Sequence, residues 1–183
     1  MKLDINKVSS TYNVRLLTID DVEACYELCM GNPLYYEYHP PIITKEGIIE
    51  DMSALPPSIQ MDQKYYIGFF DQETLVAIMD IIDGYPKPTC LYIGFFMMAK
   101  GYQGKQMGTT LIHEFISYAK SLSFYDIQLG YMKENKQSEH FWLKQGFNAI
   151  GEKAIDEGIV IKCNIYYKRA NVCSFFLFNS KFL

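Results

Sequence analysis

The spacing of apolar residues alternates along the chain between the two-residue period of a strand and the period of a helix. Alternating or unbroken apolar runs that end at turn residues predict strands at 12–17, 64–70, 75–82, 89–98, 124–132, 147–154 and 158–168. Apolar residues at helix spacing predict helices at 18–31, 44–55, 111–119 and 137–144. This mixture predicts an α/β (α+β) fold, in which the turn at 71–74 joins two strands as a hairpin.

Polar residues at the predicted helix starts support these assignments. Thr18 and Asp21 have the spacing of a capping box, and Thr44 precedes the second helix as a cap. Pro56 follows that helix, where a residue without a backbone N–H ends the hydrogen-bond ladder. These residues therefore fix where the first two helices begin and where the second one ends.

The segment 34–41 combines three tyrosines with Glu37 and His39 and closes with two prolines. Because prolines exclude a central strand, we expect a loop here. Amphipathic rings suit a binding surface, so the loop either forms a wall of a substrate site or packs on the edge of the core. We expect His39 to be packed or exposed rather than catalytic.

The stretch 102–109 lies between the strand 89–98 and the helix 111–119 and contains Gly104 and Gly108. A helix start after a glycine-bearing loop presents unpaired N–H groups and the positive end of the helix dipole, which suit a pyrophosphate. Thr109 adds a hydroxyl donor. No Lys-Ser/Thr pair follows Gly108, and the glycine spacing is not GxGxxG, so neither common nucleotide-binding motif is present.

Composition excludes several other classes. The chain has 183 residues, of which 49% are hydrophobic and 21% charged, as in a globular domain with a real core. Its net charge of −4 gives no basic surface for nucleic acid, and no apolar run is long enough for a membrane span. The N-terminus has no signal-peptide pattern. We expect one domain over 1–168, followed by a hydrophobic extension at 169–183 that could add a strand or dock across a homodimer.

Five cysteines without CxxC pairs argue against a disulfide scaffold and for a reducing compartment, which predicts a cytoplasmic location. Cys25 and Cys29 lie one helical turn apart, but we find no further ligands near them in sequence. We therefore expect two buried core thiols and no metal site.

A second motif lies further along the chain, ending at Gly146 and Phe147 after an asparagine, a small residue and an aromatic pair. This motif resembles a signature of the GNAT superfamily of N-acetyltransferases, and the stretch 102–109 resembles the acyl-CoA-binding loop of that superfamily. The matching residues are Gln103, Gly108, Asn135, Ser138, Phe141, Gly146 and Phe147. Gln106 departs from the loop pattern, where the family usually has glycine. The resemblance covers about residues 12–168.

The resemblance implies a mostly antiparallel central sheet of about six to seven strands, flanked by helices, in which a splayed strand pair forms the CoA cleft. It also implies acyl transfer from acetyl-CoA to a primary amine of a small molecule, peptide or protein. The loop amides would hold the pyrophosphate, and the strand and second motif would hold the rest of the cofactor. The implied cofactor-binding residues are Phe96, Met97, Met98, Gln103, Gly104, Lys105, Gln106, Met107, Gly108, Thr109, Asn135 and Trp142.

Trp142 marks one departure from the family pattern, because relatives often carry there a tyrosine that protonates the leaving thiolate. An indole N–H donates a hydrogen bond but is not a practical general acid. We therefore consider Tyr131 and Tyr36 as replacements. A thiol with a pKa near 8.5 is also a tolerable leaving group without help.

A second departure concerns the general base, since many relatives place a glutamate on the strand 89–98 and this strand has no acid. Asp80 lies within an apolar run of the neighbouring strand, where burial would raise its pKa. The alternative is that Asp80 points to solvent. Asp83 and Glu37 are further candidates, while the two histidines at 113 and 140 are expected at the surface.

Two other functions compete with an active acetyltransferase. Gln106, Trp142 and the acid-free strand could mark a CoA-binding module whose catalysis has degenerated, which would bind CoA without turnover. The chain could also be an unrelated α/β protein whose loop binds another phosphate, which would not bind CoA.

Overall fold

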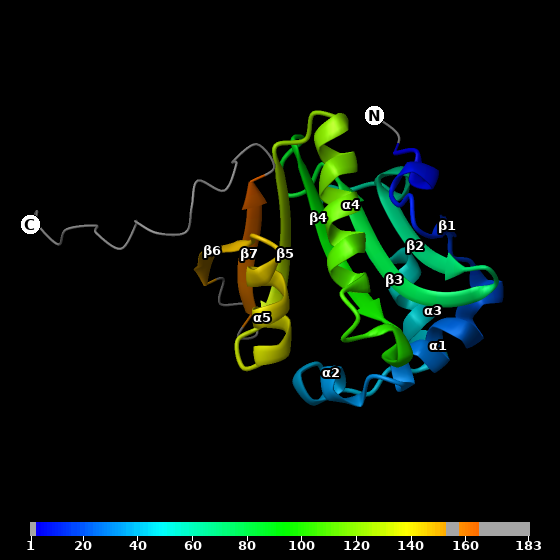
Figure 1. Ribbon diagram of the computed structural model, residues 1–183. Helices are drawn as coiled ribbons and strands as arrows, with labels where there is room; N and C mark the ends of the chain where they lie inside the picture. The colour runs from blue at the N-terminus through cyan, green and yellow to red at the C-terminus, as the bar shows by residue number, and fades with distance from the viewer. Residues whose placement is uncertain (1–2, 153–157, 165–183) are drawn as a thin grey trace, which may run out of the picture.

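The computed structural model describes residues 3–152 and 158–164 (Figure 1). The strands are β1 (Asn13–Leu16), β2 (Lys64–Asp71), β3 (Thr74–Asp83), β4 (Cys90–Met98), β5 (Asp126–Met132), β6 (Asn148–Glu152) and β7 (Gly158–Asn164). The helices are α1 (Val22–Met30), α2 (Pro33–Tyr38), α3 (Lys45–Ser53), α4 (Met107–Ser121) and α5 (Lys136–Lys144). No helix in the described ranges has the length and apolar character that a membrane crossing needs.

The strands form one seven-stranded sheet in the order β1-β2-β3-β4-β5-β7-β6. β4 and β5 are parallel, because α4 crosses between them, and the other neighbouring pairs are antiparallel. The predicted mostly antiparallel sheet of six to seven strands is therefore confirmed, as is the hairpin of β2 and β3.

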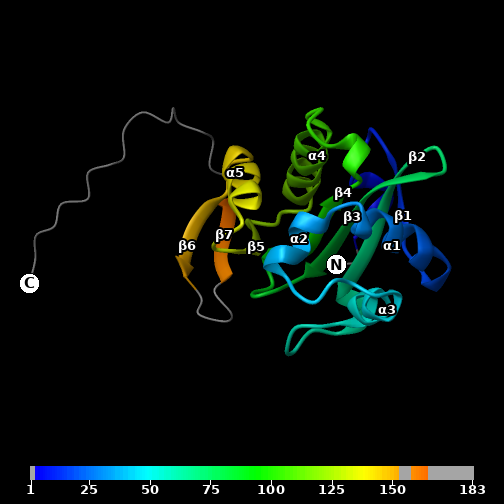
Figure 2. The ribbon, with the colours of Figure 1, turned by 90° about the horizontal axis from the view of Figure 1, so that it is seen from below.

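Helices cover both faces of this sheet. α4 and α5 lie on one face and α1 and α3 on the other, while α2 lies near the end where β4 and β5 diverge (Figures 1 and 2). Buried side chains form two clusters that correspond to the two faces. One cluster packs Phe69, Met79 and Ile93 against Phe115 of α4, and the other packs residues of α1 and α3 against the opposite side of β2 and β3.

A β-bulge at Gly94 interrupts the pairing of β3 with β4. Ile81 pairs with Ile93 and Asp80 pairs with Phe95, so Gly94 is the extra residue. The bulge reverses the alternation of side chains: Ile93 and Phe96 pack on the α4 face, whereas Phe95 packs on the α1–α3 face. It therefore turns Phe96 and Met98 toward the face that carries α4.

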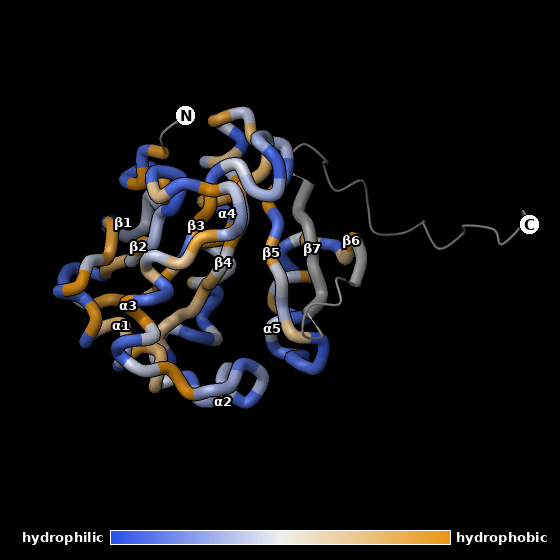
Figure 3. The backbone as a smooth tube through the Cα atoms, turned by 180° about the vertical axis from the view of Figure 1, so that it is seen from behind, coloured by the Kyte–Doolittle hydropathy of each residue, from blue (hydrophilic) through white to orange (hydrophobic). Residues whose placement is uncertain are grey.

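The pairing of β4 with β5 ends at the same place. Residues 90–93 of β4 pair with residues 126–129 of β5, and the strands then separate toward α2 (Figure 3). The predicted splayed strand pair is thus present, and within residues 3–152 and 158–164 the backbone of β4 from Gly94 onward has no strand partner on the β5 side.

The helix starts follow the predicted caps. Thr18 and Asp21 form a complete capping box at the 3₁₀ turn that leads into α1, and the Thr44 hydroxyl accepts a hydrogen bond from the N–H of Gly47 at 3.1 Å. The expectation of a loop at 34–41 was wrong, because residues 33–38 form α2. Pro33 occupies the first turn, where its fixed φ favours a helix and its missing N–H costs nothing.

Cys25 and Cys29 are buried in the core, as predicted. Burial raises the pKa of the Cys25 thiol to about 12, so it is a packed, unreactive thiol. Two other sequence predictions lie outside the described residues: the turn before Gly158 and the hydrophobic extension at 169–183. The predicted strands at 147–154 and 158–168 are observed as β6 and β7 within the described ranges.

Candidate active site

A cavity of about 360 Å³ lies between β4, α4 and α5, where β4 and β5 separate. Both sequence motifs contribute to its lining, although about 30 residues separate them in the chain. All but two of the predicted cofactor residues line it: Phe96, Met97, Met98, Gln103, Gly104, Gln106, Gly108, Thr109, Asn135 and Trp142. The fold therefore brings the two motifs together around one space.

The loop before α4 reaches its shape through two left-handed residues, Gly104 at φ +74° and Gln106 at φ +62°. Glycine adopts this conformation freely, whereas a residue with a Cβ pays for it, which explains why relatives prefer glycine at the second position. The Gln106 side chain is exposed. The backbone at Gln106 thus has the left-handed conformation that the loop requires, although a glutamine does not favour that conformation.

The start of α4 leaves its first N–H groups available to a ligand. Gln106 precedes the helix without making a side-chain cap, and the first turn holds no acidic residue. The first amides of a helix have no partner within the helix, and the dipole adds positive potential there. Lys105 and Met107 do not line the cavity; the Lys105 ammonium instead donates to the Gly101 carbonyl at 2.8 Å.

Gln103 fixes the loop against the rest of the site. Its amide nitrogen donates to the Asn32 side-chain oxygen at 2.6 Å and to the Met98 carbonyl at 2.9 Å. The Asn32 amide nitrogen donates to the same carbonyl at 3.1 Å. One network therefore connects the loop, the end of β4 and the α1–α2 junction.

The second motif supplies a cap and an aromatic wall. The Asn135 side-chain oxygen accepts from the N–H of Ser138 at 2.9 Å and so caps α5. Trp142 packs among Phe96, Phe141 and Phe147, with ring centroids 5.0–5.8 Å apart. Asn135 and Trp142 are each 6% exposed, so both are largely fixed before any ligand binds.

A smaller cavity of about 80 Å³ lies in the β4–β5 opening, next to the first. Tyr131, predicted from sequence as an acid, lines it, and burial raises the pKa of its hydroxyl. Tyr35 and His39 of the α2 region also line it; the sequence offered their segment as one alternative for a wall of a substrate site but named neither as a site residue. They lie four residues apart, a spacing that places them on one face once the segment is a helix.

A third cavity, of about 480 Å³, lies between α2, α3 and the sheet. Tyr36 lines this cavity rather than the β4–β5 opening, with Asp51 of α3 on another side. Tyr35 lines all three cavities, and His39 and Phe95 line the second and third. The three spaces are therefore adjoining, and α2 forms a shared wall.

Asp80 is held in a buried ion pair. Its two carboxylate oxygens lie 2.9 and 2.8 Å from the Lys64 ammonium, and the two side chains are 13% and 2% exposed. Of the two alternatives that the sequence left open, the structure shows the buried one: burial raises the pKa of Asp80, although Lys64 acts in the opposite direction. Asp80 also lies beside the bulge, since a Cβ on Gly94 would come within 2.5 Å of it. Its role as a base stays a prediction.

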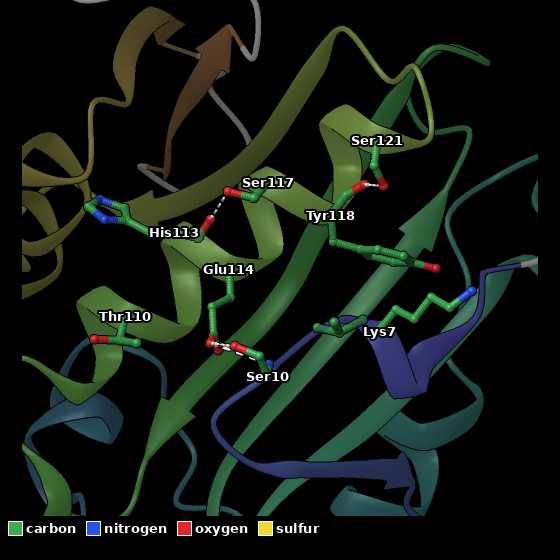
Figure 4. Close-up of a pocket in the computed structure, with 9 residues that line it drawn as sticks. Lys7, Ser10, Thr110, His113, Glu114, Ser117, Tyr118 and Ser121 are labelled. Atoms are coloured by element: carbon green, nitrogen blue, oxygen red, sulfur yellow. Dashed lines mark hydrogen bonds between the residues drawn. The ribbon is translucent and has the colours of Figure 1, made fainter.

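A larger cavity, of about 550 Å³, lies between the N-terminal segment and α4 (Figure 4). Its polar groups already satisfy one another: the Glu114 carboxylate accepts from the hydroxyls of Ser9, Ser10 and Thr11 at 2.5–2.8 Å. Ser117 and Ser121 donate to carbonyls of α4 itself. This groove joins the N-terminal segment to α4, and none of the residues 102–109 or 135–147 lines it, so it is not the candidate site.

Comparison with known families finds one family whose model covers both motifs. Residues 25–147 match the model of a family described as "Acetyltransferase (GNAT) family". That range runs from α1 to the end of the second motif. By sequence, the chain matches none of the curated proteins significantly.

Solved structures share the fold at low sequence identity. An acetyltransferase from Thermus thermophilus is 15% identical over 83% of this chain and 96% of its own, with a TM-score of 0.71. PaiA N-acetyltransferase from Thermoplasma acidophilum, solved in complex with coenzyme A, is 17% identical over 83% and 98%, with a TM-score of 0.62. The ribosomal-protein-S18-alanine N-acetyltransferase from Escherichia coli is 12% identical over 87% and 97%, with a TM-score of 0.61.

Proposed function

The chain belongs to the GNAT acetyltransferase family, and from this premise we propose that it acetylates a primary amine of a small molecule, peptide or protein by direct attack in a ternary complex. As a member, it is an acyl-CoA-dependent N-acetyltransferase, and acetyl-CoA is its acyl donor. Coenzyme A is bound in the structure of the Thermoplasma acidophilum relative.

One observation carries the proposal: the uncapped start of α4 and the open edge of β4 line the same cavity. The start of α4 suits the pyrophosphate of acetyl-CoA. The open edge of β4 offers backbone hydrogen-bonding groups to the extended, amide-containing pantetheine arm of the same molecule. The acetyl-CoA thioester supplies an activated acyl group. In this chain, Gln103 holds the loop in place and Asn135 and Trp142 shape the opposite wall.

Tyr131 is the residue we propose to protonate the departing thiolate. It lines the β4–β5 opening together with Trp142, which cannot itself act as an acid. Its raised pKa keeps the hydroxyl protonated at neutral pH, where it can donate. Tyr36 is less well placed, because it lies in the third cavity and hydrogen-bonds with Cys29.

Tyr131→Phe is expected to lower kcat at least about tenfold, because general acids typically contribute 10²–10⁴ and a thiolate can partly leave without one. Steady-state rates of thiol release measure this, and the acetyl-CoA dissociation constant should stay unchanged. Tyr36→Phe is the matched control, with less than about a threefold effect. Equal losses in both variants would remove the reason to assign the acid to Tyr131.

Gln106→Gly is expected to retain acetyl-CoA binding. The substitution removes the cost of a left-handed glutamine, about 1–2 kcal/mol, from the folded state. It also makes the unfolded chain more flexible, which disfavours folding by about 0.5–1 kcal/mol, so the free energy of unfolding should change little. Thermal unfolding and calorimetric titration check both results. A tenfold loss of affinity would show instead that the Gln106 side chain contacts the cofactor.

The functional proposal is tested by thiol release from acetyl-CoA with a panel of primary amines. Turnover with any of them supports an active enzyme. CoA binding without turnover across the panel would favour a CoA-binding module with degenerate catalysis. This is the second candidate because Trp142 stands where relatives often have the acidic tyrosine. A cytoplasmic location and a homodimer remain predictions from the sequence.

A further inference from the structure

We infer that a positively charged amine reaches the thioester through the cavity between α2 and α3, and that His39, where this cavity meets the β4–β5 opening, removes its proton. The inference rests on the proposed function, because it assigns the acceptor side of that reaction. It concerns residues of α2 and α3 that neither sequence motif includes.

We call the cavity of about 480 Å³ between α2, α3 and the sheet the acceptor cavity, and the cavity of about 360 Å³ between β4, α4 and α5 the cofactor cavity. The two lie on opposite faces of β4. Phe96 and Met98 point toward α4 and line the cofactor cavity, whereas Phe95 packs with the α1–α3 cluster and lines the acceptor cavity. The bulge at Gly94 creates this division, and Gly94 itself lines the opening between the two. Two substrates can therefore approach one point from opposite sides, as a ternary complex requires.

His39 stands at the junction of the two spaces. It follows the last residue of α2, and its ring stacks on Tyr35 with centroids 4.6 Å apart and planes 14° apart. Tyr35 in turn packs edge-on against Tyr36 and Phe95, at 5.1 and 5.6 Å. The imidazole is therefore held in place by an aromatic cluster, as a group that must meet an incoming amine should be.

The surroundings keep His39 suited to accept a proton. Burial lowers the pKa of His39 below its usual 6.5, so the imidazole is neutral at pH 7. The titratable groups that line the two cavities with it come from α1, α2, the α3 region, β2 and β5: Cys29, Tyr35, Tyr36, Glu46, Glu50, Asp51, Tyr66 and Tyr131. Burial raises the pKa of the Cys29 thiol, so it stays protonated at neutral pH. The tyrosines beside His39 remain protonated, because burial raises their pKa. His39 is the group on both linings that can act as a base at neutral pH.

The acceptor cavity also has a charge preference. Glu46, Glu50 and Asp51 line it, and no lysine or arginine does among the described residues. Burial raises the pKa of Asp51, although the Lys64 ammonium acts in the opposite direction and solvent still reaches the carboxylate. Tyrosine and phenylalanine faces complete the wall, and these attract cations as carboxylates do. An ammonium is thus favoured here and a carboxylate-bearing acceptor is disfavoured.

The proposed step balances without a further reactant. His39 takes one proton from the bound ammonium, and the freed lone pair on nitrogen forms the bond to the thioester carbonyl carbon. The carbon–sulfur bond breaks with its electron pair on sulfur, and Tyr131 or water protonates the thiolate. The nitrogen of the adduct loses its second proton, which restores the proton that Tyr131 or water has given up. His39 later returns its proton to solvent, so the products are an amide, the CoA thiol and one proton.

The charge preference is tested with three acceptors that differ only in their tail: 1,4-diaminobutane, butylamine and 4-aminobutanoate. We expect kcat/KM to fall about tenfold from the first to the second and at least about tenfold again to the third. The double variant Glu46→Gln/Asp51→Asn should flatten this order, whereas Asp62→Asn, at an exposed carboxylate outside the cavity, should not. Equal rates for the three amines, or a preference for 4-aminobutanoate, would overturn the assignment of the cavity.

The role of His39 is tested by the pH profile of kcat/KM with the best of these amines. With a base of lowered pKa, the profile should level off above about pH 6.5. In His39→Phe, which keeps a ring against Tyr35, the rate should drop by about 100-fold at pH 7 and rise about tenfold per pH unit toward the pKa of the amine, near 10. His113→Phe, at an exposed histidine of α4, should reproduce the parent profile.

These outcomes separate the inference from the function on which it rests. Turnover with an unchanged pH profile in His39→Phe would reject His39 while leaving the acetyltransferase in place. Failure of every amine despite CoA binding would instead reject the proposed turnover. Circular dichroism and CoA affinity of His39→Phe show whether the variant is folded, and His39→Gln provides a second, polar replacement if it is not.

Discussion

Gly108→Asp is expected to reduce the affinity for acetyl-CoA by at least about 100-fold, or roughly 2.7 kcal/mol. Gly108 lies in the first turn of α4 and lines the cofactor cavity. A Cβ there would lie 3.4–3.5 Å from Phe141 and Met98, so an added carboxylate would extend into the cleft. It would repel the negatively charged pyrophosphate and accept hydrogen bonds from the N–H groups that would otherwise bind the phosphate. Calorimetric titration measures the loss.

Two substitutions separate charge from size in this experiment. Gly108→Ala adds only a methyl group, at distances that are ordinary van der Waals contacts, and should retain most of the affinity. Gly101→Asp adds the same carboxylate at an open position, where a Cβ meets nothing within 4 Å, and should bind as the parent does. If Gly108→Asp bound acetyl-CoA as tightly as these controls, the pyrophosphate would not lie at this helix start.

Asp80→Asn is expected to destabilise the protein by about 3–5 kcal/mol, because it leaves the Lys64 ammonium buried without its counter-charge. Lys64 is only 2% exposed, and the two oxygens of Asp80 lie within 2.9 Å of it. For a chain of this length, the loss corresponds to a fall in Tm of roughly 10 °C. Thermal and denaturant unfolding measure it.

The double variant Lys64→Met/Asp80→Leu supplies the control. Removing both charges should recover most of the lost stability, since a buried ion pair is often replaceable by apolar residues of similar volume. Activity then separates the two roles considered for Asp80. If the double variant is stable and retains turnover, Asp80 is structural. A stable double variant without turnover would show that Asp80 acts in the reaction, against the assignment of the base to His39.

Local signals in the sequence were enough for most of the fold. Caps at Thr18 and Thr44 marked helix starts, and apolar periodicity located the strands to within a few residues. Both motifs could be identified because each is contiguous: the first contains Gly104 and Gly108, and the second runs from Asn135 to Phe147. That the two motifs meet around one cavity could be expected only from the family resemblance, because a local sequence pattern does not give the distance between two separate segments.

The acceptor side was harder to predict because it depends on α2. This helix has six residues between an asparagine and two prolines, too short for an apolar period to show. Without the helix, the shared face of Tyr35 and His39 is invisible, and His39 was expected to be merely packed or exposed. His39 is packed against Tyr35, as expected, and both side chains also line the β4–β5 opening.

The environment of Asp80 depended on strand register, which the sequence does not give. Lys64 and Asp80 lie 16 residues apart on neighbouring strands and meet because Tyr66 pairs with Asp80. The bulge at Gly94 likewise becomes visible only when β3 and β4 are aligned. The sequence left open whether Asp80 is buried in its apolar run or points to solvent, and the lysine that pairs with it lay outside any local window.

Calorimetric titration of the purified protein with acetyl-CoA, and in parallel with CoA, tests the assignment of the cleft most directly. We expect one site per chain with micromolar affinity for both, about −8 kcal/mol, since the pyrophosphate and the arm are common to the two ligands. Absence of binding to either ligand by folded protein would contradict the assignment of the α4 loop and the open edge of β4 as the cofactor site.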